Sequence, residues 1–293
     1  MRLTSIYLAL LLSILCMSTS SIIVRLCTAP ALIISFYRVI FTTIIAASVG
    51  GRPAFYSFKQ LSRRDLLYIM GSGIFLALHL GFWITSLSYT SVSSSVLFTN
   101  LQVIFVLIFS ALFLKEKVNC WVTGGILTAL AGSVLIVHGD LQSGKFLGDM
   151  LALLSGFFVA IYFLIGRNVR PRVDVWTYTA LAAGAAVVVL LPACEIFGLK
   201  FGGYPRIDWL WFLLQALGPG IGGHVILNWA LKYMKAPVVS VSVLGESVGA
   251  SILAFFIFHE YLLWYQIIGG IFILTGIYIA AVNEKSQTVK KAQ

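Results

Sequence analysis

Residues 91–114 read SVSSSVLFTNLQVIFVLIFSALFL, an unbroken stretch without a charged side chain. An α-helix rises about 1.5 Å per residue, so a helix of this length crosses the roughly 30 Å hydrocarbon core of a bilayer. The whole chain has the same character: 60% of its 293 residues are hydrophobic and only 10% are charged. A soluble domain is about 45–50% apolar and about 25% charged. The composition therefore predicts an integral membrane protein and excludes a water-soluble enzyme, a disordered chain and a nucleic-acid-binding domain.

Nine further stretches are long and apolar enough to span a membrane. The sequence predicts an all-α integral membrane fold with ten transmembrane helices, at about residues 4–25, 30–50, 66–88, 91–114, 119–138, 147–167, 173–192, 208–231, 236–258 and 261–283. The first span follows Arg2 and could pass for a signal peptide, but its length and the nine later spans favour an uncleaved helix. The longest connection is expected at about 51–65. Because no loop is long enough for a folded domain, the function must lie within the helix bundle.

The basic residues are distributed unevenly between the connections. If the N-terminus is cytoplasmic, fifteen of the 20 Lys and Arg residues fall on the cytoplasmic side: Arg2, Arg52, Lys59, Arg63, Arg64, Lys115, Lys117, Arg167, Arg170, Arg172, Lys232, Lys235, Lys285, Lys290 and Lys291. Four fall outside (Arg25, Lys145, Lys200 and Arg206), and Arg38 lies within a span. Cytoplasmic loops of membrane proteins are enriched in Lys and Arg, so both termini are predicted to be cytoplasmic. The net charge of +10 then faces anionic lipid headgroups, and no nucleic-acid partner is needed to explain it.

The two halves of the chain share landmarks. Aligned residues that are identical between them are Leu87 and Leu231, Tyr89 and Tyr233, Ile108 and Ile252, Glu116 and Glu260, Gly125 and Gly269, Leu130 and Leu274, and Gly132 and Gly276. This predicts two five-helix repeats, at 4–138 and 147–283. An odd number of spans per repeat inverts the second half, which is typical of transporters with alternating access around a midplane site. Channels and membrane enzymes can have repeats too.

Six motifs, in this order and spacing, resemble the EamA-type family of the drug/metabolite transporter superfamily over essentially the whole chain: HLGFW at 79–83, SLSYTSV at 86–92, LFLKEK at 112–117, GDMLALLS at 148–155, NWALKY at 228–233 and GESVGA at 245–250. The resemblance implies a ten-helix carrier that exports small metabolites through a central cavity between its halves. Val103 and Ser247 stand where the family often has proline, so the usual cause of a helix kink is missing at both positions.

Two charged residues lie deep within predicted spans, Glu246 and Arg38. A charge near the bilayer centre costs roughly 2.5–3.5 kcal/mol, so each should face the bundle interior or a water cavity. Their depths are similar enough for an ion pair. The alternatives are a static bridge between the halves, substrate contact or proton coupling at Glu246, and a protonated glutamate without a role.

Three further polar residues lie inside spans. Gln102 is the repeat counterpart of Glu246 and, beside Asn100, either joins helices or lines the cavity. His79 and His224 occupy near-equivalent repeat positions, where a helix–helix hydrogen bond and a role in substrate or proton binding are the alternatives. No Cys, Asp or Glu stands at ligand spacing beside them, so no metal site is predicted. The four cysteines predict neither a disulfide framework nor a metal site.

Trp83 and Trp229 lie about one turn from span ends, as interface belt residues or cavity walls. Asn228, in the NWALKY motif, completes the candidate substrate-binding or coupling set. Residues 218–223, GPGIGG, should loosen the eighth span, because a proline and four glycines interrupt it. Glu116 and Glu260 are expected to pair with Lys117 or to cap a helix end.

The sequence therefore predicts a secondary transporter that exports a small polar or aromatic metabolite, such as an amino acid, by alternating access. The alternatives are a passive facilitator or channel for small solutes and, less favoured, a membrane-embedded enzyme. Neither a Gly-x-Ser-x-Gly elbow nor a His-Glu-x-x-His motif is present, so no catalytic residue is predicted. No cofactor is expected. The expected partners are the metabolite and the lipid bilayer, and the expected location is the cell (inner or plasma) membrane, as a multi-pass monomer or homodimer.

Overall fold

The computed structural model describes residues 3–90, 92–137, 146–259 and 263–290, and every element within them is a helix. In chain order these elements are α1 (Leu3–Leu26), α2 (Ala31–Lys59), α3 (Arg63–Ser86), α4 (Val92–Asn100), α5 (Gln102–Phe113), α6 (Cys120–Val137), α7 (Phe146–Val169), α8 (Val175–Ile196), α9 (Arg206–Gln215), the π-helix η1 (Ala216–Val225), α10 (Ile226–Ala230), α11 (Ala236–Val243), α12 (Gly245–Phe258) and α13 (Trp264–Lys290). Arg2, Lys145, Glu260 and Lys291 lie outside the described residues.

The described helices have the length and composition that a membrane requires. Nine helical stretches within the described ranges are long and apolar enough to span a bilayer, and the shorter apolar helix Cys120–Ile136 makes a tenth candidate. Three of the ten are built from consecutive elements: α4 with α5, α9 with η1 and α10, and α11 with α12. The predicted all-α, multi-span fold is therefore confirmed. The inverted repeat and the cytoplasmic placement of the termini stay predictions.

Two spans are interrupted at equivalent points although neither contains proline there. The break between α4 and α5 falls at Leu101, and the break between α11 and α12 falls at Leu244. At both places the backbone switches to tighter i→i−3 hydrogen bonds, from Ile104 N to Leu101 O and from Ser247 N to Leu244 O. Each break creates a new helix start, which places Gln102 and Glu246 in a first helical turn.

The prediction of a long connection at residues 51–65 is wrong, because most of this segment is helical. α2 continues to Lys59 after a kink at Gly51, whose φ of 51° and ψ of −142° are open only to glycine without strain. Pro53 follows in the first turn after the kink, where its missing N–H is tolerated. The connection to α3 shrinks to Gln60–Ser62, and Ser62 caps α3 by accepting a hydrogen bond from the Asp65 N–H at 3.0 Å.

The glycine-rich stretch of the eighth span forms η1 instead of an α-helix. Pro219 supplies no N–H to the ladder, and the four nearby glycines remove side chains that would fill the wider turns. The close approach of α1 also requires glycine here, because a Cβ at Gly222 would lie 2.6 Å from Cys16 Sγ. The predicted loosening of this span is thus confirmed, in the specific form of a π-helix.

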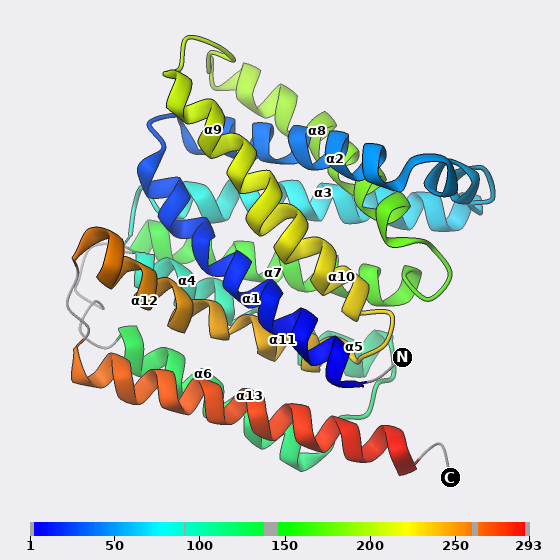
Figure 1. Ribbon diagram of the computed structural model, residues 1–293, viewed down its shortest axis with the longest axis vertical. Coiled ribbons are helices and arrows are strands. Elements are labelled where there is room, and N and C mark those ends of the chain that lie inside the picture. The colour runs from blue at the N-terminus through cyan, green and yellow to red at the C-terminus, as the bar shows by residue number, and fades with distance from the viewer. Residues whose placement is uncertain (1–2, 91, 138–145, 260–262, 291–293) are drawn as a thin grey trace.

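Figure 1 shows α6 and α13 side by side along one edge of the bundle, with α2 and α8 toward the opposite edge. The α6–α13 contact is close because glycines face each other; a Cβ added at Gly125 would lie 2.6 Å from the Gly276 carbonyl oxygen. The start of α1 and the end of α13 lie at the same end of the bundle, where Tyr7 Oη donates a hydrogen bond to Ala281 O at 2.7 Å. The remaining helices pack between these edges.

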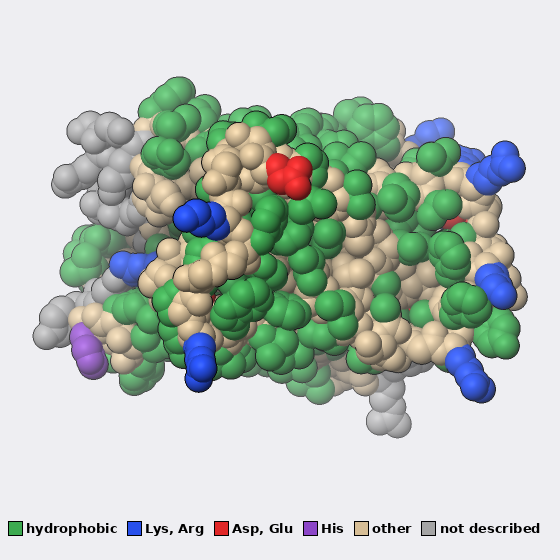
Figure 2. All heavy atoms as spheres, turned by 90° about the horizontal axis from the view of Figure 1, so that it is seen from above, with side chains coloured by type: hydrophobic (Ala, Val, Ile, Leu, Met, Phe, Trp, Pro, Cys, Tyr) green, Lys and Arg blue, Asp and Glu red, His purple; other side chains and the backbone are tan. Residues whose placement is uncertain are grey.

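The outer surface has the distribution of apolar and basic side chains that suits a lipid bilayer. In Figure 2 hydrophobic side chains cover the middle of the visible face, and Lys and Arg side chains gather toward the two ends of the molecule. One end joins the end of α2 (Lys59), the start of α3 (Arg63 and Arg64) and the α7–α8 connection (Arg170 and Arg172); we call it the basic end. Trp121 and Trp264 are 65% and 71% exposed, as interface anchors should be.

Candidate functional site

A central cavity lies among helices from both halves of the chain. It is lined by Met17 and Ser20 of α1, Arg38 of α2, His79 and Trp83 of α3, Val96, Thr99 and Asn100 of α4, Gln102 of α5, Val159 and Phe163 of α7, His224 of η1, Val243 of α11, and Glu246 of α12. Its volume is about 30 Å³, room for about two water molecules. Every lining residue is buried. The cavity wall contains all the predicted site residues except Asn228.

Arg38 is held in place by neutral partners. Its Nη1 donates to Ser20 Oγ and to Gln215 Oε1, each at 3.2 Å, and the Gln215 amide in turn donates to Ser20 O at 2.7 Å. Among the described residues no acidic side chain lies within ion-pair distance of Arg38. The static bridge to Glu246 is therefore wrong in this conformation. Arg38 is 2% exposed, and its guanidinium keeps the Nε and Nη2 hydrogens for other ligands.

Glu246 owes its position to the break at Leu244. It lies in the first turn of α12, where the partial positive charge of a helix N-terminus favours a carboxylate. Its neighbour Ser247 accepts a hydrogen bond from Asn100 Nδ2 at 2.9 Å, which joins α4 to α12 beside the cavity. Within the described part of the chain the Glu246 carboxylate has no hydrogen-bond or ion-pair partner, and the residue is 7% exposed.

The two intramembrane histidines, His79 and His224, are in contact with each other. Their ring centroids are 5.9 Å apart in an edge-to-face arrangement. Ser155 fixes His79, because its Oγ lies 2.8 Å from His79 Nδ1. Neither ring nitrogen of His224 has a hydrogen-bond partner among the described residues. His224 stands in the last turn of η1, so the π-helix decides which way its ring faces.

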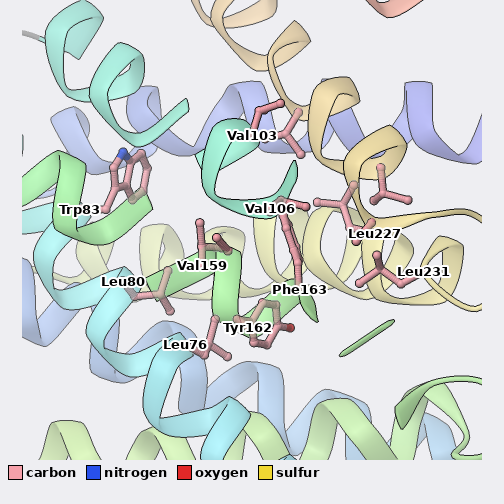
Figure 3. Packing of buried hydrophobic residues seen from close by; sticks show 14 of the residues in the cluster. Leu76, Leu80, Trp83, Val103, Val106, Val159, Tyr162, Phe163, Leu227 and Leu231 are labelled. Atoms are coloured by element: carbon pink, nitrogen blue, oxygen red, sulfur yellow. The ribbon is translucent and has the colours of Figure 1, made fainter. Parts of the chain in front are cut away.

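Gln102 and Trp83 complete the wall with different chemistry. Gln102 Oε1 is buried with no donor among the described side chains or backbone groups. Trp83 is 5% exposed and lies inside the bundle, which excludes a lipid-facing belt position for it. Trp229 does not line the cavity and packs on Tyr233, with ring centroids 5.2 Å apart. Figure 3 shows the apolar packing beside the cavity, where Leu80 of α3 lies next to Val159 of α7.

Asn228 is not brought to the central cavity. Its Nδ2 donates to the Tyr162 hydroxyl, and its backbone oxygen accepts from Arg170 Nε at 3.1 Å. In this conformation Asn228 therefore does not share the central cavity with the other candidates, because its side chain points toward Tyr162 of α7. Its role in substrate binding or coupling stays a prediction. Burial lowers the pKa of Arg170, which lies between two spans.

A second cavity of about 20 Å³ adjoins the first and shares Arg38 and His224 with it. Its other walls are Val39, Thr42, Leu76, Leu80, Tyr162, Thr179, Ala182, Ala183 and Gly220. The sequence did not predict the polar members Thr42 and Thr179, nor Ser20, Thr99 and Gln215 around the first cavity. The available signal was a polar side chain within a span, which is weaker for hydroxyls than for charges.

Charged side chains cross-link the basic end. Arg167 Nε lies 2.7 Å from Glu116 Oε1, and the other Glu116 oxygen accepts the Ala236 N–H at 3.2 Å. Arg172 lies 2.5 Å from Asp65 Oδ1. Of the two roles expected for Glu116, pairing with Lys117 is wrong, because α7 brings the Arg167 guanidinium closer. Capping a helix end is confirmed, since Ala236 is the first residue of α11. These contacts join the α5–α6 connection, the end of α7 and the start of α11.

Comparison with known proteins gives the same picture. A relative from Archaeoglobus fulgidus named an uncharacterized transporter is 26% identical over 93% of this chain and 94% of its own length. The pseudopaline exporter CntI of Pseudomonas aeruginosa is 24% identical over 73% of both chains. A protein of known crystal structure, 17% identical, superposes with a TM-score of 0.77 over 97% of this chain and 99% of its own, which supports the fold. The EamA-like transporter family matches residues 4–138 and 146–282. With nearly the whole chain matched, and with helices suited to a bilayer around a polar cavity, the protein belongs to the EamA-like transporter family and is a multi-pass membrane transporter.

Proposed function

We propose that this transporter is a secondary carrier that exports a small zwitterionic or polar heteroaromatic metabolite, such as an amino acid or a related compound, by alternating access. The observation that carries the proposal is a guanidinium and a carboxylate, Arg38 and Glu246, which line one buried cavity without pairing with each other. A zwitterion brings an opposite charge to each of them.

The free energy of burial supports this choice of ligand. An ionised group inside a protein is costly unless it is paired and hydrogen-bonded. A carboxylate on Arg38 would form a charge-assisted pair, and an ammonium on Glu246 would do the same. A neutral lipophile would leave both groups unpaired and would gain little from either.

The neutral polar groups of the cavity add directional contacts. Gln102 Oε1 is an acceptor without a donor, and His224 has two ring nitrogens without partners among the described residues. Leaving a buried donor or acceptor unsatisfied costs about 1–3 kcal/mol, so a ligand that pairs with them gains affinity. An N–H of an amino, amide or heteroaromatic group on the substrate could donate to Gln102 Oε1, and a heteroaromatic nitrogen could pair with either ring nitrogen of His224 according to its tautomer.

Several features support a carrier over a passive channel. The cavity is small and its lining residues are buried, which fits a binding site better than a continuous pore. The matching breaks at Leu101 and Leu244 support the proposal that residues 4–138 and 147–283 work as inverted repeats. The name of the Pseudomonas relative, an exporter, supports the export direction.

Counterflow tests the proposal. Purified protein is reconstituted into liposomes preloaded with one unlabelled amino acid, and uptake of the same labelled compound is followed. A carrier accumulates label transiently above equilibrium because it exchanges substrate across the membrane, whereas a pore does not. Transient accumulation of at least one compound, abolished by Arg38→Met, is the expected result. Label that only equilibrates would overturn the carrier in favour of a channel, and no entry of any zwitterion would overturn the substrate class.

A further inference from the structure

The second cavity differs in chemistry from the first. The central cavity carries the carboxylate of Glu246 and the amide of Gln102. The second cavity has mainly aliphatic walls, from Leu76 and Leu80 on α3 and from Ala182 and Ala183 on α8. Figure 3 shows Leu76 and Leu80 on successive turns of α3 beside Tyr162. An ammonium group is therefore stabilised in the first cavity and an apolar group in the second.

Arg38 stands between the two cavities and lines both. Both of its hydrogen bonds to Ser20 and Gln215 use Nη1, so the Nε and Nη2 hydrogens remain for a carboxylate, which a guanidinium binds as a two-pronged fork. A carboxylate bound there borders the central cavity, which stabilises an ammonium group, and the second cavity, which has aliphatic walls. The guanidinium, the Glu246 carboxylate and the aliphatic walls thus match in chemical kind the carboxylate, the ammonium and the side chain that an amino acid carries on its α-carbon.

One polar group in the second cavity lacks a partner. Thr179 is 6% exposed, and its Oγ1 makes no hydrogen bond with any described residue. A wholly apolar ligand would leave this hydroxyl unsatisfied, while a side chain that ends in a hydroxyl or a similar group would satisfy it. The volume of about 20 Å³ limits the occupant to a few heavy atoms.

We infer that the second cavity is the subsite for the substrate's side chain, and that it selects compact side chains, preferably with one hydrogen-bonding group that meets Thr179. The inference rests on the proposed carrier function and assigns substrate selection to Ala183, Leu76 and Thr179. Arg38 and Glu246 then bind the parts that all amino acids share.

A larger side chain in the wall of the second cavity tests the inference. Ala183→Val adds two methyl groups to its wall, and one methylene of misfit in an apolar pocket changes selectivity by about 10-fold or more. Counterflow of threonine and valine should fall about 10-fold relative to glycine. Ala186→Val is the matched control, because Ala186 is equally buried on α8 but lines neither cavity. A uniform loss for all substrates in Ala183→Val would overturn the subsite.

Two further variants keep the test decisive if Ala183→Val folds poorly. Leu76→Ala enlarges the second cavity and should raise leucine transport about 10-fold relative to alanine transport. Thr179→Val keeps the side-chain shape and removes the hydroxyl, so the ratio of threonine to valine transport should fall about 10-fold. Unchanged selectivity in both variants would overturn the subsite and leave the carrier proposal intact. Absence of amino-acid counterflow in the unmodified protein would overturn both proposals.

Discussion

Glu246 is a buried carboxylate without a partner among the described residues, and we propose that its partner is the substrate that enters the cavity. Neutralising it removes a charge that is costly to bury, and the folded protein should not suffer. This expectation differs from that for an ion pair between Glu246 and Arg38. In such a pair, neutralising one residue would leave the other charge unpaired and reduce the amount of folded protein.

We expect Glu246→Gln to lower counterflow about 10- to 100-fold, the loss of one charge-assisted hydrogen bond of about 1.5–3 kcal/mol. Yield and thermal unfolding in detergent should match the unmodified protein, as they should for the exposed control Glu195→Gln. If counterflow survives while accumulation driven by a pH gradient disappears, Glu246 couples protons instead. Unmodified transport in both assays would remove it from the mechanism.

Gln102 and the exposed tryptophans provide a contrast between cavity and surface. Gln102→Ala removes a buried acceptor that has no donor among the described residues, so we expect little loss of folded protein and a weaker, less selective transport. His79→Ala should act in the same direction, although it also removes the contact with Ser155. Trp121→Ala and Trp264→Ala should leave substrate preference unchanged. The reverse pattern in well-folded protein would place the substrate outside the central cavity.

At the scale of elements, α6 and α13 lie away from the cavity and depend on glycine for their contact. The Cβ of Gly125→Ala would meet the Gly276 carbonyl oxygen and the Ala280 nitrogen, both backbone atoms, so the two helices must move apart. Such overpacking costs about 1–3 kcal/mol. Gly124→Ala on the same helix meets nothing within 4 Å and is the matched control. We expect a lower unfolding temperature for Gly125→Ala alone; equal stability of the two variants would mean that the contact is looser.

The cross-links at the basic end are placed to oppose opening toward that side. Arg167 and Glu116 join the α5–α6 connection, the end of α7 and the start of α11, and both are only partly exposed. Removing one such ion pair by Arg167→Met should favour opening by about 1 kcal/mol, or about fivefold in population. Labelling of Val243→Cys by a membrane-impermeant reagent, with the four native cysteines replaced by serine, should accelerate accordingly. A slower reaction would show that the pair stabilises the open form.

For the whole molecule, the distribution of charge predicts which face is cytoplasmic. The start of α1, the end of α13 and the basic end lie together, so one measurement orients all of them. A phosphatase that is active only outside the cytoplasm should be inactive when fused after Gln293 and active when inserted after Gly202, in the α8–α9 connection at the other end. Activity after Gln293 would reverse the orientation and the assignment of the basic end to the cytoplasm.

The sequence alone determined that the chain is a helical membrane protein and approximately where its spans lie. It also identified the candidate substrate-binding or coupling residues inside those spans. The reason is physical: a bilayer demands about 20 apolar residues per span and satisfied backbone groups, so a charge such as Glu246 stands out against its surroundings. Six of the seven candidate residues line one cavity because buried polar groups in a bundle share the few places where lipid is excluded.

Only the tertiary structure decided which partners those residues have. Arg38 pairs with Ser20 and Gln215 and not with Glu246, and Asn228 points away from the cavity toward Tyr162. Depth along a helix can be counted from the sequence, but the rotation of each helix about its axis depends on many weak packing contacts across the bundle. The GPGIGG stretch predicts that η1 departs from an α-helix, but the direction in which His224 faces and the second cavity depend on the same packing contacts.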